Sequence, residues 1–296
     1  MTPMQIFLIV AYLFLIGFYI KNWKAIMEIP KDIVTNWQLV RALAKNDMKS
    51  KFAGSVLGVV WAFVQPVVTV LVYWFVFEKA IGAATQSTKA GIDAPFVLWL
   101  VAGIVSWFFF ADAVNFGTSS LISYNYLVKK VVFKIDVLPV VRMISCLFVH
   151  LFFIAFTLLM FLLYGRFPTV YWLQIPYYLI CTFVLAMGIV YATSAVAVFF
   201  RDLLQVVNIL LQLLIWGTPI MWNFYGMKNI SPVMQAILKA NPMFYIVNGY
   251  REALIGGTPF WADGELMAWF WFITLLIFGV GILIFRKLRM HFADVL

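Results

Sequence analysis

Few residues of this sequence could carry out catalytic chemistry. The 296 residues include 2 histidines, His150 and His291, and 12 Asp and Glu residues that do not cluster. The sequence holds no GxxxxGKS/T phosphate loop, no HExxH zinc motif and no serine nucleophile elbow. An enzyme acting on membrane lipids needs carboxylates, histidines or a metal gathered at a membrane face. The sequence therefore predicts a protein that is not an enzyme by itself, has no metal site and depends on another chain for any ATP binding.

A second group of residues places charge where a membrane would oppose it. Asp112 interrupts an apolar run, and Arg251 and Glu252 lie together in another apolar stretch. An ionised side chain inside a bilayer costs at least ~2.5 kcal/mol, so we expect these residues to face a water-filled path, a polar partner or a seam between two copies. Aromatic clusters present ring faces that suit sugars, although lipid contact or an interfacial belt is the stronger explanation for most of them. The candidate path or seam residues are Trp61, Tyr73, Trp74, Asp112, Trp216, Arg251 and Glu252.

The composition indicates a membrane protein. The chain is 65% hydrophobic and 11% charged, whereas a soluble domain carries about 25% charged residues. Its net charge of +9 would suggest nucleic acid as the partner of a soluble protein. Here the Lys and Arg residues collect in alternate loops, as the positive-inside rule requires, so no nucleic-acid partner is expected.

Seven apolar runs each approach or exceed the ~20 residues that a membrane-spanning helix needs. They cover residues 4–20, 56–77, 96–118, 140–164, 172–200, 203–222 and 267–285. The first lacks the basic start and the cleavage site of a signal peptide, so we interpret it as a retained anchor. With the basic loops in the cytoplasm, the N-terminus lies outside and the C-terminus inside. The sequence predicts an all-α polytopic membrane protein.

Residues 31–51 predict a helix at the membrane surface, because apolar residues recur at steps of four, three, four and four with basic residues between them. The apolar set is Ile33, Trp37, Val40, Ala44 and Met48, and the basic set is Arg41, Lys45, Lys49 and Lys51. This periodicity gives an amphipathic helix whose basic face suits an anionic membrane surface. A basic helix that leads directly into a span suggests a transport subunit docked to a cytoplasmic partner.

Two further cytoplasmic connections depart from simple loops. Residues 119–141 can form a short amphipathic helix with Lys129 and Lys130 on one face, or remain an ordinary basic loop. In the tight link before the sixth run, Asp202 can cap the next helix through its side chain, with a Gln three residues on closing a capping box. Arg201 beside it can snorkel to the surface or face a partner. A purely structural turn explains this pair equally well.

The external segment 223–266 is unusually apolar for a loop. Ser231-Pro232 and Asn241-Pro242 each have the pattern of an N-cap followed by a first-turn proline, and they open two stretches, residues 232–240 and 242–255. At ~1.5 Å per residue neither stretch can cross the bilayer. Two re-entrant half-helices that dip in from outside fit this pattern, and so do two helices lying on the outer surface.

Several short motifs occur in an order that resembles one family. The motifs are Gly54-Ser55-Val56-Leu57-Gly58 with Trp61 and Pro66, Asn125-Tyr126-Leu127-Val128-Lys129-Lys130 with Leu138-Pro139, Phe199-Phe200-Arg201-Asp202-Leu203, Thr218-Pro219-Ile220, Asn241-Pro242 and Phe292-Ala293-Asp294-Val295-Leu296. In this order they resemble the permease subunits of type-2 ABC exporters for polysaccharides and polyol phosphates, the O-antigen, teichoic acid and capsule exporters. The resemblance covers residues 31–296. It leaves residues 1–30 as an additional anchor and linker, because members commonly have six spans, and Lys134 stands where the family often has proline.

The resemblance implies an assembly and a cargo. Two copies of this chain would form a path above two ATP-binding subunits, which hold ATP and Mg, while this chain binds no cofactor. The residues at the ATPase surface would be Asn125, Leu127, Lys129, Lys130 and Phe133 in a coupling helix and Trp37, Arg41 and Lys45 in the interface helix. The cargo would be a polyprenyl-(pyro)phosphate-linked polysaccharide or teichoic-acid-like polymer, moved out across the bacterial cytoplasmic membrane.

Two alternatives remain open. Another type-2 ABC permease, which exports a drug, a peptide or a lipid, would share the same topology, although the aromatic richness and the pattern at residues 125–130 favour a glycan. An integral-membrane transferase acting on polyprenyl lipids is disfavoured by the scarcity of histidines and the scattered carboxylates.

Overall fold

A computed structural model describes residues 3–51, 54–129, 134–227 and 230–295 of the chain. Within these ranges almost all regular structure is helical, apart from two short antiparallel strands, β1 (Gln86–Ser87) and β2 (Asp93–Ala94), in which Gln86 lies opposite Ala94. The all-α class predicted from the sequence is confirmed.

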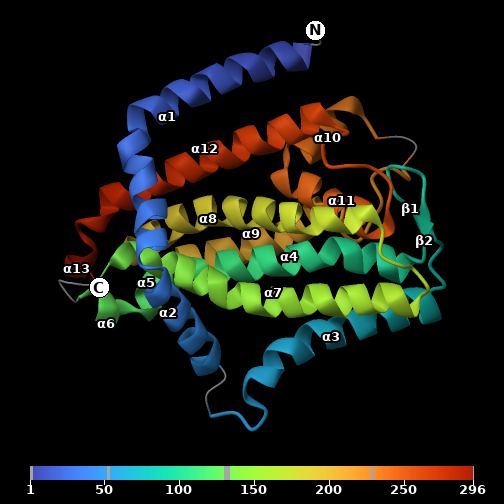
Figure 1. The fold of residues 1–296 in the computed structure, drawn as a ribbon, viewed down its shortest axis with the longest axis horizontal. Coiled ribbons are helices and arrows are strands. Elements are labelled where there is room, and N and C mark those ends of the chain that lie inside the picture. The colour runs from blue at the N-terminus through green and yellow to red at the C-terminus, as the bar shows by residue number, and fades with distance from the viewer. Residues whose placement is uncertain (1–2, 52–53, 130–133, 228–229, 296) are drawn as a thin grey trace.

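The long helices lie side by side and give the bundle two distinct ends (Figure 1). One end, called the hairpin end here, carries β1, β2, α10 (Pro232–Ala240) and α11 (Pro242–Ile255). The other, called the C-terminal end, carries α5 (Ser120–Ser123), α6 (Asn125–Val128) and α13 (Phe292–Val295).

Six helices of the described residues are long and apolar enough to cross a membrane. They are α1 (Pro3–Thr35), α3 (Trp61–Tyr73) with its π-helical continuation η2 (Trp74–Ala80), α4 (Phe96–Thr118), α7 (Leu138–Leu163), α8 (Ile175–Phe199) and α12 (Gly264–Arg289). Single 3-10 segments precede three of them: η1 (Gly58–Val60), η3 (Ile135–Val137) and η4 (Val170–Gln174).

The seventh predicted span, residues 203–222, is only partly helical. Helix α9 (Leu203–Gly217) has 15 residues, which at ~1.5 Å per residue reach ~22 Å and fall short of the ~30 Å hydrocarbon core. The helix ends before Thr218-Pro219, and the chain continues without helix to Asn223. There the Asn223 amide donates a hydrogen bond of 3.0 Å to the Ser87 carbonyl in the hairpin. The segment therefore reaches the hairpin end as a short helix followed by turns and bends.

The N-terminal region also differs from the prediction of an anchor, a linker and a helix over residues 31–51. Helix α1 continues without interruption to Thr35, and α2 (Trp37–Ser50) follows after a break at Asn36. The residues between the predicted anchor and the predicted helix contain no glycine and include several strong helix formers, and the helix continues through Pro30, which lies inside it. In Figure 1, α1 runs beside α12, then turns and crosses the C-terminal end of the bundle before it leads into α2.

Helix α4 forms the centre of the bundle. It is apolar all round and packs against α7, α8, α9 and α11, as expected of a buried helix. Outside it, α8 and α12 approach so closely that a Cβ atom on Gly281 would lie 2.0 Å from the Gly188 carbonyl oxygen. Small residues at such a crossing allow membrane helices to pack backbone against backbone.

The two short helices after α9 begin as the sequence predicts. The Ser231 hydroxyl accepts a hydrogen bond from the Met234 amide at 3.3 Å, and the Asn241 side chain accepts one from the Met243 amide at 3.0 Å. Helix α11 ends at Gly256, which has a positive φ of 97°. Most of α10 is exposed, whereas α11 is buried against α4 and α8.

Candidate functional site

A buried carboxylate at the C-terminal end joins three separate segments of the chain. The Tyr124 hydroxyl, between α5 and α6, donates a hydrogen bond to Asp47 Oδ1 of α2 at 2.5 Å. Arg142 of α7 places Nη1 3.2 Å from the same oxygen, and its guanidinium carbon lies 4.9 Å from the centre of the Tyr124 ring. We call this group the Asp47 junction. It connects the surface helix α2 and the 119–141 connection to a membrane-spanning helix.

Burial gives the junction its strength. Asp47 is 5% exposed, and removing one partner of a buried ion pair destabilises a protein by about 3–5 kcal/mol. Burial and the adjacent Asp47 raise the pKa of Tyr124 well above its usual value, so the phenol remains a hydrogen-bond donor. The sequence prediction missed this group. Its one local signal was an acidic residue three positions after Ala44, on the apolar face of an amphipathic helix.

The predicted coupling residues divide into an exposed set and a buried set. Asn125 in the single turn of α6 and Lys129 directly after it are exposed, whereas Leu127 is buried and anchors that turn. Lys130 and Phe133 lie outside the described residues. The exposed surface of this connection therefore includes Asn125, Tyr126 and Lys129.

The predicted interface-helix residues Trp37, Arg41 and Lys45 are all exposed on α2. Val40 and Ala44 are fully buried, and the helix packs on α7. The amphipathic pattern thus identified the correct faces of this helix.

Arg201 and Asp202 are both exposed in the tight turn between α8 and α9. The prediction that Asp202 caps α9 through its side chain was wrong, because no side-chain cap hydrogen bond forms there. Asp202 already has right-handed helical angles, φ −65° and ψ −14°, whereas a capping side chain usually requires extended backbone. Its carbonyl oxygen instead accepts hydrogen bonds from the Gln205 and Val206 amides.

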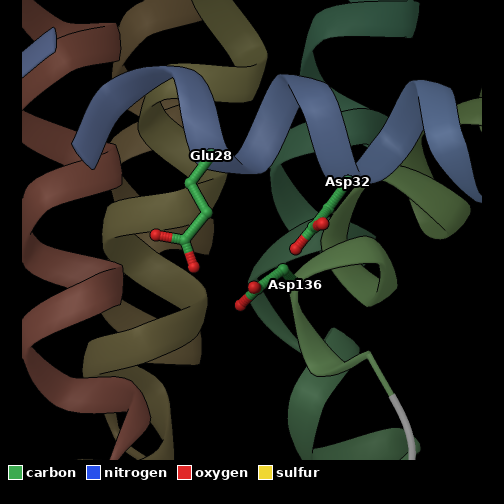
Figure 2. A group of neighbouring side chains, drawn as sticks. All are labelled: Glu28, Asp32 and Asp136. Carbon is green, nitrogen blue, oxygen red and sulfur yellow. The ribbon is translucent and has the colours of Figure 1, made fainter. Parts of the chain in front are cut away.

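A second charged cluster attaches α1 to the bundle. Figure 2 shows Glu28 and Asp32 of α1 directed towards Asp136, with carboxylate oxygens within 4.8 Å of one another. Arg286 and Arg289, at the end of α12, contact Glu28 at 2.6 and 3.2 Å, and Arg289 also contacts Asp136. Lys134 contacts Asp32 at 3.4 Å. Such a carboxylate group could hold a cation, but each carboxylate already has a basic partner.

Arg251, a predicted path residue, is instead 2% exposed and holds the broken end of α9 in place. Its Nη1 and Nη2 atoms donate to the carbonyls of Pro219 and Ile220 at 2.7 and 2.6 Å. Its Nε donates to the Trp99 carbonyl at 3.2 Å, and the guanidinium stacks on the Trp99 ring. Non-helical backbone at membrane depth needs partners within the protein, and Arg251 supplies them.

Glu252 has a similar role next to Arg251. Its carboxylate accepts hydrogen bonds from the Lys89 amide at 2.7 Å and from the Thr258 amide and hydroxyl at 3.1 Å. The Lys89 ammonium lies 2.7 Å from Asp263. Partial burial opposes ionisation of Asp263, but the hydrogen bond and charge of Lys89 outweigh it, and the pKa of Asp263 is lowered. These contacts close the loops of the hairpin end over α11.

Residues 38–255 of this chain match the model of the ABC-2 type transporter family. The chain belongs to this family. Relatives include O-antigen export system permease proteins RfbA from Klebsiella pneumoniae, at 24% and 25% identity over 261 residues, which cover 88% of this chain and 95% of each relative. RfbA of Myxococcus xanthus is 24% identical over 256 residues, covering 86% of this chain and 94% of the relative. Membership of the family implies an ABC ATP-binding partner, and α1 lies before the matched segment.

Within the family segment, the remaining candidate path residues lie on α3, η2, α4 and α9. Asp112 is exposed on the single chain and lines a cleft of about 290 Å³ with Lys51, Gln65 and Thr69. Tyr73 and Trp74 are half-buried near the end of α3, while Trp61 and Trp216 are exposed on α3 and α9. The candidate residues therefore form two groups. Asp112, Trp61 and Trp216 are exposed, whereas Arg251 and Glu252 are buried and hydrogen-bonded within the chain.

Proposed function

We propose that this chain is the membrane-spanning subunit of an ATP-driven exporter that moves a polyprenyl-(pyro)phosphate-linked polysaccharide or teichoic-acid-like polymer out of the cell. The Asp47 junction is the observation that carries the proposal, because it links two exposed surface elements to a spanning helix. The names of the relatives, O-antigen export permeases, support a glycan cargo.

The partner is an ATP-binding subunit, present in two copies, that holds ATP and Mg. It docks against the exposed residues Asn125 of α6, Lys129 directly after that helix and Lys45 of α2, on the two segments that meet at the Asp47 junction. When ATP closes the partner, α6 and α2 move together because Tyr124 binds Asp47, and Arg142 passes the movement to α7. The permease itself hydrolyses nothing.

The C-terminal end faces the cytoplasm of a bacterial cell, and the N-terminus and the hairpin end face outside. The basic residues Arg286, Lys287 and Arg289 at the end of α12 support this orientation. Helix α1 runs parallel to α12, because Tyr12 binds the Ala268 carbonyl and Tyr19 binds the Leu275 carbonyl.

Two copies of the chain form the path between them. Helices α3 and α9 are little buried within one chain, and Asp112 is exposed although it lies in a spanning helix. An exposed carboxylate at that depth is costly unless it meets water or a polar partner. A second copy, with a hydrated path along the seam, meets that need.

Affinity purification of the chain from its native membrane tests the proposal. Mass spectrometry should find an ABC ATPase in about equal amount and a polyprenyl-linked glycan. An ATPase with a bound drug, peptide or lipid but no glycan would assign the chain to a different export cargo. Recovery without an ATPase would refute the exporter.

A further inference from the structure

An apolar groove lies where α1 and α2 cross α7 and α8. Its volume is about 420 Å³ and its lining is wholly apolar. Val34 and Trp37 form one wall, Ile144 lies on α7, and Ile180 and Phe183 lie on α8. Val34 is 75% and Ile180 56% exposed, so the groove is open on the outside of the chain.

The packing of the bundle explains why this space is not filled. Helix α7 packs mainly on α4, whereas α8 packs mainly on α12 and then on α4, and α7 and α8 touch each other much less. The crossing of α1 and α2 covers one end of the groove between α7 and α8. Along α8 the lining extends from Leu179 to Met187, which is about 12 Å of helix. The groove therefore runs along spanning helices, in the direction in which a lipid chain lies.

The covered end of the groove changes from apolar to basic. Trp37 lines it and is half exposed, as is common for tryptophan at a membrane interface. Arg41 follows four residues later, so it lies on the same side of α2, and it is exposed. An apolar furrow with an aromatic residue and a cation at its mouth complements a hydrocarbon chain joined to a phosphate.

We propose that this groove binds one acyl chain of an anionic phospholipid of the adjacent leaflet, with the lipid phosphate against Arg41. The apolar lining offers no partner to a peptide or a sugar, and the cation selects an anionic headgroup. One wall comes from α1 and the first residue of α2, which precede the family match at residue 38. The site thus joins residues before the family match to helices within it, and it does not depend on which cargo the exporter moves.

Photo-crosslinking tests the site in the purified full chain with its ATPase, in phosphatidylcholine nanodiscs. Phosphatidylglycerol with a diazirine on its acyl chain should label peptides of α7 and α8. Val34→Trp fills the groove and should abolish this labelling, whereas Val10→Trp, at an exposed position of the same helix outside the groove, should not. If Val34→Trp fails to fold, Ile180→Trp is the second filling variant.

The headgroup is tested separately by competition. Unlabelled phosphatidylglycerol should displace the probe better than phosphatidylcholine does. Arg41→Gln should weaken the binding of phosphatidylglycerol about fivefold, the effect of one cation on an anionic lipid. Lys49→Gln, at an exposed position elsewhere on α2, should leave it unchanged. Labelling that persists in both filling variants, equal displacement by the two phospholipids, or stronger displacement by a polyprenyl phosphate would each overturn the assignment.

Discussion

Replacing Tyr124 with phenylalanine removes one hydroxyl from the Asp47 junction and keeps the ring that packs beside Arg142. The lost hydrogen bond joins a donor at 2.5 Å to a carboxylate that is 5% exposed. A hydrogen bond to a charged group contributes about 1.5–3 kcal/mol. If the bond holds α6 and α2 in their docked arrangement, its loss weakens ATPase binding by about 10- to 100-fold.

The assay is the affinity of the purified ATP-binding subunit for the chain in nanodiscs, together with the ATP turnover of the complex. Tyr225→Phe is the matched control, because Tyr225 is exposed at the hairpin end, away from α2 and α6. It should bind the ATPase like the native chain.

A double-mutant cycle then separates a shared junction from two independent contacts. Asp47→Asn removes the charge that both Tyr124 and Arg142 contact. The double variant with Tyr124→Phe should therefore bind the ATPase only slightly more weakly than Asp47→Asn alone. If the two substitutions weaken ATPase binding by additive free energies, or if Tyr124→Phe binds the ATPase with native affinity, α2 and α6 do not act through one carboxylate.

Three other experiments test the fold and its orientation. Arg251→Lys cannot reach the same carbonyls and should lower the free energy of unfolding by about 3 kcal/mol, seen as a lower Tm in detergent. Arg201→Lys, at an exposed position, should leave Tm unchanged. Gly281→Ala places a Cβ against the facing glycine carbonyl and should destabilise the chain by about 1–3 kcal/mol, measured in the same way; an unchanged Tm would contradict the close crossing. A membrane-impermeant maleimide should label Thr85→Cys in intact cells but Asn125→Cys only after permeabilisation. Both native cysteines are buried and should not react. The reverse labelling pattern would invert the topology.

Periodic patterns predicted the elements of this fold well where the pattern is local. The step between Val40 and Ala44 identified the buried face of α2, although Trp37 of the same apolar set is exposed, and the prolines after Ser231 and Asn241 marked the starts of α10 and α11. Element ends were harder to predict. The apolar run at 203–222 looks continuous because Thr218 and Pro219 change its hydropathy little, yet proline cannot continue the hydrogen-bond ladder.

The site was predictable only as separate pieces. Asp47, Tyr124 and Arg142 are far apart in the sequence, and no local pattern shows that they share one contact. Arg251 was expected to face a water-filled path, a polar partner or a seam, and the sequence could not choose among these for a related reason. A charged residue in an apolar stretch predicts a polar environment. For Arg251 that environment consists of backbone carbonyls, including that of Pro219, which have no helical hydrogen-bond partner. The two features could have been linked, because a break in an apolar run leaves carbonyls that need a donor.

Transport in a reconstituted system tests the central claim most directly. The chain and its ATP-binding subunit would be placed in vesicles with a polyprenyl-linked glycan, and glycan reaching the opposite face would be measured with and without ATP. The account predicts ATP-dependent movement that is strongly reduced in Asp47→Asn, while Tyr225→Phe behaves like the native chain. ATP hydrolysis without glycan movement, or full transport in Asp47→Asn, would contradict it.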